Sequence, residues 1–170
     1  MKIGLLSDTH SFLHPRVFKH FEHCHEIWHA GDIGQPEILK QLQDFKPLRA
    51  VYGNIDGGVI RKSCPAHQRF EVEGFRVWIT HIGGYPPGYN KEVKKELLQM
   101  KTDIFICGHS HLLKIQRDPQ LSDMLYINPG AAGKQGFHKV LTLVRFDLKD
   151  GSCQNMQVIE LGKRGELEQL

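Results

Sequence analysis

Short apolar runs separated by amphipathic segments mark the first half of the chain. The runs with the length of β-strands are residues 2–6, 25–29 and 48–52. Helices are predicted between them, one from Pro15 to about Phe21 and another that begins at Pro36 and has apolar residues at helical spacing. Strand and helix therefore alternate, which is typical of an α/β fold.

The second half of the chain alternates apolar and polar residues with a period of two. Apolar residues alternate on both sides of Glu73-Gly74, which predicts a β-hairpin. The other predicted elements are a helix at 91–100, a strand at 103–107, and hairpins over 112–127 and 140–159. We expect an α/β sandwich with mixed sheets in one domain, residues 1–170, with a charged tail that is frayed from about residue 162.

Length and charge narrow the class of protein further. The chain has 170 residues, of which 40% are hydrophobic and 24% are charged, as in a soluble globular domain. The net charge of +3 is small, and no run of Lys and Arg forms a basic stripe. We therefore expect no nucleic-acid groove.

Cysteine usage and the amino terminus bear on the cellular compartment. The four cysteines lie roughly 40 residues apart without a CxxC pair, which disfavours a zinc or disulfide framework and favours a reducing compartment. The first apolar stretch ends at Asp8, too early for a signal peptide, and no apolar run approaches the ~20 residues of a membrane span. We expect a soluble, cytoplasmic protein without a membrane partner.

Polar residues of a few types follow five of the predicted strands. In chain order they are Asp8 and His10, Asp32, Asn54, His81, and His109 with His111. In an open α/β sheet, ligands bind beyond the carboxyl ends of the strands, so these side chains are expected to meet at one edge. A glycine precedes three of the groups, where we expect the backbone to turn tightly.

Each of these features has an ordinary explanation when it stands alone. Asp-x-His, Gly-Asp and Gly-Asn occur in common turns, and a histidine at a strand end is often only a hydrogen-bond partner. The stretch Gly108–His111 is the strongest signal, since its two histidines can both reach a metal ion from a loop. Together, seven oxygen and nitrogen donors are too many for one tetrahedral zinc ion and suit two metal ions such as Mn, Fe or Zn, which a carboxylate can bridge.

These motifs, in this order, resemble those of the calcineurin-like metallophosphoesterases. Residues 127–131 (INPGA) and the short length are similar to a small bacterial and archaeal phosphodiesterase subfamily, which is related to the phosphoesterase-like subunit of retromer. The resemblance extends from Lys2 to about Phe146. It implies a four-layer α/β/β/α sandwich of two mixed β-sheets.

The resemblance also implies a division of the seven residues between two metal ions. Asp8, His10 and His111 would hold the first ion, Asn54, His81 and His109 the second, and Asp32 would bridge both. Asp32, Asn54 and His109 are the residues expected to act in catalysis. The cofactors would be two divalent ions, with Mn²⁺ favoured and Fe, Zn, Ni or Co as alternatives.

The expected reaction is hydrolysis of a P–O bond in a small phosphoester or phosphodiester. Two metal ions can activate a bridging hydroxide for in-line attack on phosphorus and stabilise charge on the phosphoryl oxygens. Many relatives carry a histidine directly after the Gly-Asn pair, where this chain has Ile55. Isoleucine cannot donate a proton to a leaving group, which favours diesters over monoesters; alternatively, Ile55 only packs under the turn.

Other polar residues have two interpretations each. Asp56 either orients Asn54 or a histidine or belongs to a simple turn, and Asn128 either lines the rim of the site or forms an Asn-Pro turn. His29 is expected in the core, and Lys134 and Lys139 are weak candidates to approach an anionic substrate. Surface positions or local hydrogen bonds are expected for His14, His20, His23, His25, His67 and His138.

Two other functions remain open from the sequence. A metal-degenerate scaffold, like the retromer subunit, would work through protein contacts, but it would be free to lose ligands that this chain retains. A monoesterase or protein phosphatase is disfavoured by Ile55 and by the short chain. The physiological substrate, the native metal and the oligomeric state, including a homo-oligomer, stay open.

Overall fold

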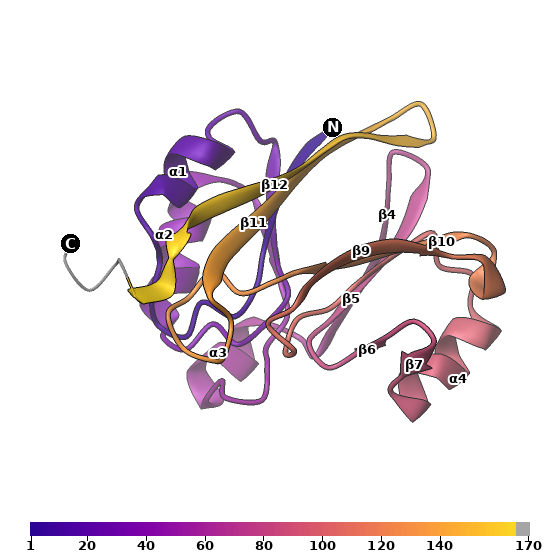
Figure 1. The fold of residues 1–170 in the computed structure, drawn as a ribbon, viewed down its shortest axis with the longest axis horizontal. Coiled ribbons are helices and arrows are strands. Elements are labelled where there is room, and N and C mark those ends of the chain that lie inside the picture. The colour runs from indigo at the N-terminus through magenta and orange to yellow at the C-terminus, as the bar shows by residue number, and fades with distance from the viewer. Residues whose placement is uncertain (166–170) are drawn as a thin grey trace.

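Two mixed β-sheets lie face to face, and helices cover the outer side of each (Figure 1). The computed structural model describes residues 1–165. In chain order the elements are β1 (Lys2–Leu6), α1 (Arg16–Phe21), β2 (Glu26–His29), α2 (Pro36–Phe45), β3 (Leu48–Ala50), α3 (Gly58–Ser63), β4 (His67–Val72), β5 (Phe75–Thr80), β6 (Gly84–Tyr85), β7 (Gly88–Tyr89), α4 (Lys91–Gln99), β8 (Ile104–Ile106), β9 (Leu113–Asp118), the 3₁₀ helix η1 (Pro119–Leu121), β10 (Met124–Pro129), β11 (Val140–Lys149) and β12 (Ser152–Lys163).

The strand order places parallel strands in the middle of both sheets. The first sheet has the order β12-β11-β1-β2-β3, and β1, β2 and β3 are parallel. The second has the order β4-β5-β8-β10-β9, and β5, β8 and β10 are parallel. Antiparallel strands complete each sheet. The predicted four-layer α/β/β/α sandwich of two mixed sheets is confirmed.

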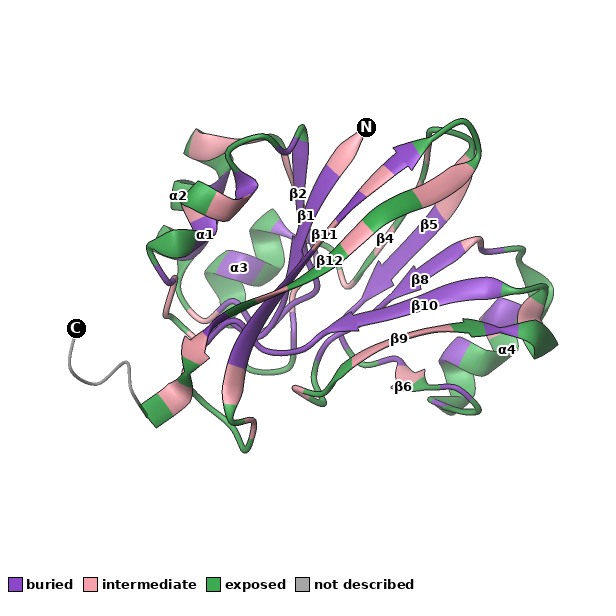
Figure 2. Ribbon diagram, turned by 45° about the horizontal axis from the view of Figure 1, so that its top comes forward, coloured by how far each residue is buried: buried purple, intermediate pink, exposed green. Residues whose placement is uncertain are grey.

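Side chains that alternate along the strands build the core in layers. In β5, Val77 and Ile79 pack against apolar residues of the first sheet such as Leu5, whereas Trp78 packs toward Val93 of α4. Figure 2 shows the central strands largely buried and the helices exposed on their outer faces. This period of two is the pattern that predicts the strands from the sequence.

Helices α1, α2 and α3 cover the outer face of the first sheet. Val17 of α1, Leu42 of α2 and Ile60 of α3 share one apolar cluster with Leu6 of β1. Helix α2 begins at Pro36, where the fixed φ of proline suits the first helical turn. Within residues 1–165, no helix is long and apolar enough to span a membrane.

The structure departs from the sequence predictions at several places. Strand β3 ends at Ala50 rather than residue 52, because the Tyr52 amide donates to the carbonyl of Pro65 instead of continuing the ladder. Helix α3 and the short hairpin of β6 and β7 were not predicted. Residues 162 and 163 of the predicted tail still pair with β11 as the end of β12. The remainder of the predicted tail, residues 166–170, lies outside the described residues.

Candidate metal centre

The predicted donors meet where strands of both sheets end. Because β1, β2 and β3 are parallel, as are β5 and β8, the loops after these five strands emerge at one edge of the sandwich. These loops carry all seven residues that the sequence singles out: Asp8, His10, Asp32, Asn54, His81, His109 and His111.

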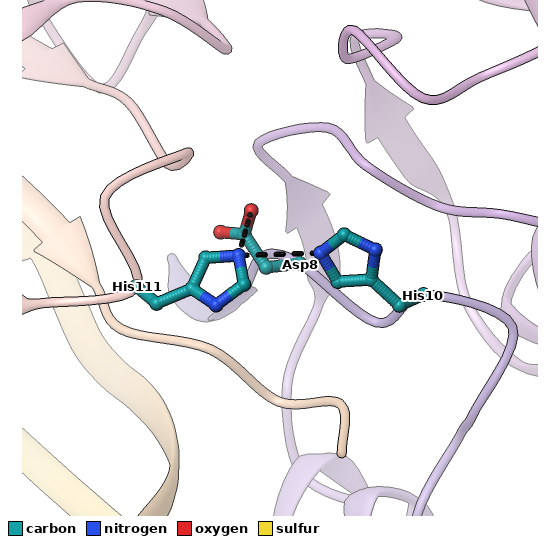
Figure 3. Close-up of side chains that lie close together, drawn as sticks. All are labelled: Asp8, His10 and His111. Atoms are coloured by element: carbon teal, nitrogen blue, oxygen red, sulfur yellow. Dashed lines mark hydrogen bonds and ion pairs between the residues drawn. The ribbon is translucent and has the colours of Figure 1, made fainter. Parts of the chain in front are cut away.

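The first group consists of Asp8, His10 and His111. One ligand atom of each lies within 4.8 Å of the others. The Nε2 atoms of the two histidines are 3.2 Å apart, and Oδ1 of Asp8 is 3.2 Å from Nε2 of His111. Figure 3 shows the two imidazoles facing each other beside the buried carboxylate.

The second group consists of Asp32, His81 and His109, with Asn54 beside it. The ligand atoms of the first three lie within 4.8 Å of one another. Nε2 of His81 is 3.1 Å from Oδ1 of Asp32 and 3.1 Å from Oδ1 of Asn54. Nδ1 of His81 donates to the carbonyl of Ala30 at 2.8 Å, so in the neutral ring the lone pair of Nε2 points at these two oxygens.

Asp32 lies between the two groups. Its Oδ1 is 3.1 Å from Nε2 of His81, and its Oδ2 is 3.7 Å from Nε2 of His10. One carboxylate thus presents one oxygen to each group. The amide of Ile55 also donates to Oδ1 at 3.1 Å, which restricts rotation of the carboxylate.

The donor spacing fits divalent metal ions. Ligand atoms that share an ion at about 2.1 Å lie about 3.0–3.4 Å apart in octahedral or tetrahedral geometry. The four closest contacts, at 3.1–3.2 Å, match this spacing. Lone pairs of nitrogen and oxygen that converge in this way repel one another unless a proton or a metal cation lies between them.

The charged groups around this centre attract positive charge. Burial lowers the pKa of His81, but its hydrogen bond to Asp32 and the charge of Asp8 outweigh burial and leave that pKa raised. Burial likewise raises the pKa of Asp32, yet His81 holds it below its ordinary value. For His10, burial dominates and lowers the pKa, which favours the neutral ring that binds metal.

Five of the seven candidate ligands have a left-handed backbone. Their φ values are 54° for Asp8, 46° for His10, 53° for Asp32, 67° for His109 and 58° for His111. Such conformations cost roughly 1–3 kcal/mol each, although Asp and His tolerate them better than most residues. Strain of this kind gathers at functional sites, where it directs side chains that regular structure would send elsewhere.

Two glycines permit the loops to approach one another. A Cβ on Gly53 would lie 2.0 Å from Oδ1 of Asp32, and one on Gly108 would lie 2.0 Å from Oγ of Ser7. Neither glycine has a positive φ, yet each begins a tight turn, as expected: the amide of Asp56 donates to the carbonyl of Gly53 at 3.3 Å, and the amide of Ser110 donates to the carbonyl of Gly108 at 2.8 Å. Gly31, before Asp32, does have the expected left-handed backbone, with φ of 95°.

Asp56 ties two of the ligand loops together through backbone amides. Its carboxylate accepts from the amides of Ile33 at 3.1 Å, Gly34 at 2.7 Å and Gly53 at 2.7 Å. These amides belong to the loops that carry Asp32 and Asn54. Asp56 therefore does more than form a local turn, because it joins two ligand loops. Its hydrogen bonds go to backbone amides, however, and not to the Asn54 side chain or a histidine, as one interpretation predicted.

Asn128 supports the loop that carries the last two histidines. Its Oδ1 accepts from the amide of Gly130, as the turn interpretation predicts. Its Nδ2 donates to the carbonyl of Gly108 at 2.9 Å and to Oγ of Ser110 at 3.0 Å. At 1% exposure, Asn128 lies behind the rim rather than on it. Lys134 lies over the ring of Phe12 at 4.3 Å.

His29 is a core residue, as predicted. Its Nδ1 accepts from the amide of Gly31 at 3.1 Å. Its Nε2 lies 3.0 Å from Oγ1 of Thr9, which itself donates to the carbonyl of Ile33. Complete burial lowers the pKa of His29 to about 4.

This buried histidine makes stability depend on pH. The folded pKa of about 4 lies below the unfolded value near 6.5, so the unfolded chain binds the extra proton between these values and stability falls as the pH falls. From pH 7.5 to 5.0 the loss is roughly 2 kcal/mol for this group. Urea unfolding of metal-free protein should show that His29→Gln loses less stability over this range than wild type; equal losses would contradict the assignment.

Two residues near the centre were missed by sequence analysis. Arg61 of α3 donates to the carbonyl of Asp56 at 2.7 Å and so holds the loop that carries Asn54. Nδ1 of His138 lies 3.3 Å from Nδ1 of His111, although a surface position or a local bond was expected. His14 is buried, and its Nδ1 accepts from the amide of Arg16, which confirms the local hydrogen bond that was one of its two predicted roles. The chain has eleven histidines in 170 residues, and this high count is the signal in the sequence that bears on His138.

The family model and the curated relatives that match this chain are all phosphoesterases. Residues 1–151 match the model of the calcineurin-like phosphoesterase superfamily domain. A probable metallophosphoesterase of Methanothermobacter thermautotrophicus is 36% identical, with 77% of each chain covered. A phosphodiesterase of Methanocaldococcus jannaschii is 27% identical, covering 76% of this chain and 83% of that protein.

Solved structures share the fold over nearly the whole chain. An archaeal phosphodiesterase superimposes with a TM-score of 0.74 at 24% identity, covering 95% of this chain and 100% of the other. Vps29 of Chaetomium thermophilum superimposes with a TM-score of 0.73 at 17% identity, covering 96% and 99%. At these identities the likeness concerns the fold alone.

Proposed function

This chain belongs to the calcineurin-like phosphoesterase superfamily, and we propose that it is a phosphodiesterase that acts with two divalent metal ions. It is a phosphoesterase of the metallophosphoesterase family. The observation that carries the proposal of two ions is the position of Asp32, whose two carboxylate oxygens face different ligand groups.

The donor sets suit two ions of intermediate hardness. Asp8, His10 and His111 would hold one ion, and Asn54, His81 and His109 the other, with Asp32 shared. Mixed imidazole and oxygen donors favour Mn, Fe or Zn, with Ni and Co also compatible, and we propose Mn²⁺ as the first to test.

Some of the proposed ligands are buried and others are exposed to solvent. When bound, two divalent ions lower the pKa of a coordinated water and neutralise charge on a phosphoryl group. Asp8, Asp32 and His81 are buried and fix the inner side of the centre, whereas Asn54 and His109 are exposed. The two exposed residues are thus able to contact substrate, in line with their proposed catalytic part.

The surroundings of the second group favour diesters. Ile55 is 46% exposed, so it does not pack under the turn as one interpretation expected, and its side chain offers no proton to a leaving group. An open pocket of about 370 Å³ adjoins Asn54 and His81 and is also bordered by Tyr52 and Ile82. This volume is within the range of small-ligand pockets and leaves room for an ester substituent.

A protein-binding scaffold is the second candidate function, because Vps29 shares the fold of this chain. The strained backbone at five ligand positions argues for a metal centre, since a surface for protein contacts does not require it. We therefore favour the hydrolase.

The proposal is tested by a metal-dependent activity screen. Protein stripped with a chelator and reloaded with Mn²⁺ is assayed against bis-p-nitrophenyl phosphate, p-nitrophenyl phosphate and cyclic nucleotides. We expect hydrolysis that requires metal and is fastest with a diester. Failure to hydrolyse any of these esters with Mn, Fe, Zn, Ni or Co would reject the enzyme in favour of the scaffold.

Replacing Ile55 tests the diester preference. Ile55→His adds a group that can donate a proton beside Asn54, and general acids contribute about 10²–10⁴-fold when well placed. We expect the ratio of monoester to diester kcat/KM to rise about tenfold or more. The control is Val59→His, at an exposed position on α3. An unchanged ratio in Ile55→His would show that this position does not decide leaving-group choice.

A further inference from the structure

The imidazole of His138 lies directly behind a ligand of the first group. Its Nδ1 is 3.3 Å from Nδ1 of His111, and the two ring centroids are 5.2 Å apart at 70°. Its Nε2 is 2.8 Å from the carbonyl oxygen of Gly133. His138 belongs to the loop between β10 and β11, well separated in sequence from the Gly-His-x-His loop.

These contacts determine where the hydrogens lie in the neutral rings. A carbonyl oxygen only accepts, so Nε2 of His138 carries the hydrogen that it donates to Gly133. A neutral imidazole has a single N–H, and Nδ1 of His138 is therefore an acceptor. Of the two facing Nδ1 atoms, that of His111 must then be the donor. Nε2 of His111 is left with a free lone pair, 3.2 Å from both Oδ1 of Asp8 and Nε2 of His10.

We propose that His138 is a positioning residue for the first metal ion, which selects the His111 tautomer and holds its ring. The inference rests on the proposed function, because it assigns a partner to one of the proposed metal ligands. Ligand histidines commonly donate their second ring N–H to an acceptor that fixes the tautomer. In the second group, the acceptor for His81 is the backbone carbonyl of Ala30. In the first group, the acceptor for His111 is the side chain of His138.

The surrounding loop keeps His138 in this position. The amide of Gly133 donates to the carbonyl of Asp8 at 3.0 Å, so the residue that accepts from His138 is itself fixed to the first ligand loop. Gly136 covers the pair of rings: a Cβ there would lie 2.1 Å from Nδ1 of His111 and 3.2 Å from Nδ1 of His138. The position thus accommodates only glycine, as expected for a closely packed partner.

Two substitutions separate the proposed role from simple packing. In His138→Asn, Oδ1 takes the place of the acceptor Nδ1, whereas in His138→Gln the amide nitrogen keeps the donor to Gly133 but the acceptor is lost. Metal-free proteins are titrated with Mn²⁺ against a chelating indicator. Thermal unfolding of each metal-free variant checks the fold. His23→Gln, an exposed position after α1, is the matched control.

We expect His138→Gln to weaken one of the two Mn²⁺ binding events about 10–100-fold, and His138→Asn to stay within about threefold of wild type, like the control. Nitrogen-15 NMR of metal-free wild type should show His111 protonated at Nδ1, and His138→Gln should show mixed tautomers. Equal binding by the Asn and Gln variants, or His111 protonated at Nε2, would overturn the role of His138. Wild type that binds none of Mn, Fe, Zn, Ni and Co would instead contradict the proposed function itself.

Discussion

Asp32→Asn should lower kcat/KM for bis-p-nitrophenyl phosphate with added Mn²⁺ by at least about a thousandfold, which corresponds to about 4 kcal/mol of transition-state stabilisation. The substitution keeps the size of the side chain and an oxygen for the Ile55 amide. It removes the negative charge and one of the two oxygens that face the ligand groups. Bound metal, measured by elemental analysis, should fall from two ions to one or fewer per chain.

The control for this substitution is Asp44→Asn. Asp44 is exposed on α2, and its ion pair within the described residues is with Lys40, so its loss should leave activity and metal content near those of wild type. A purified, folded Asp32→Asn protein with near-wild-type activity would reject the shared position of Asp32 between two ions.

Gly108→Ala should reduce activity about a hundredfold or more although it replaces none of the seven candidate ligands. The added Cβ would lie 2.0 Å from Oγ of Ser7 and 2.8 Å from Oδ2 of Asp8, so the loop that carries His109 must move away from the loop after β1. A displacement of about 1 Å at a catalytic centre is enough for a hundredfold loss. Because Asp8 belongs to the first group and His109 to the second, metal content should also fall.

Gly57→Ala is the matched control. Gly57 lies in the loop after Asn54 with φ of −83°, and a Cβ there would meet no atom within 4 Å. Kinetics and elemental analysis of the two variants, measured side by side, check the prediction. If Gly108→Ala and Gly57→Ala retain the same activity, the close approach of the two ligand loops is not required.

The positions of the donors were predictable because strand ends are local features. An apolar run that stops at a polar residue marks the end of a strand, and parallel strands bring such ends together. Asp8, Asp32 and His81 each follow such a run, and the structure brings them within one centre. The mixed sheets were predictable from another local feature. Strands alternate with helices in the first half of the chain, and the apolar residues alternate with polar ones as in hairpins in the second half.

The supporting contacts were not predictable because they join segments that are distant in sequence. Asp56 binds amides of the loop after β2, and His138 reaches His111 across the whole of β9 and β10. Nothing local distinguishes His138 from a surface histidine. Gly108 illustrates a second limit: a glycine that makes room for another loop has the same sequence appearance as a turn glycine.

Anomalous diffraction from a crystal of the Mn²⁺-loaded protein, recorded on both sides of the manganese absorption edge, tests the central claim most directly. We predict two manganese peaks, one bound by Asp8, His10 and His111 and one bound by Asn54, His81 and His109, with Asp32 in contact with both. A single peak, or manganese bound elsewhere while these seven residues hold none, would contradict a centre of two metal ions.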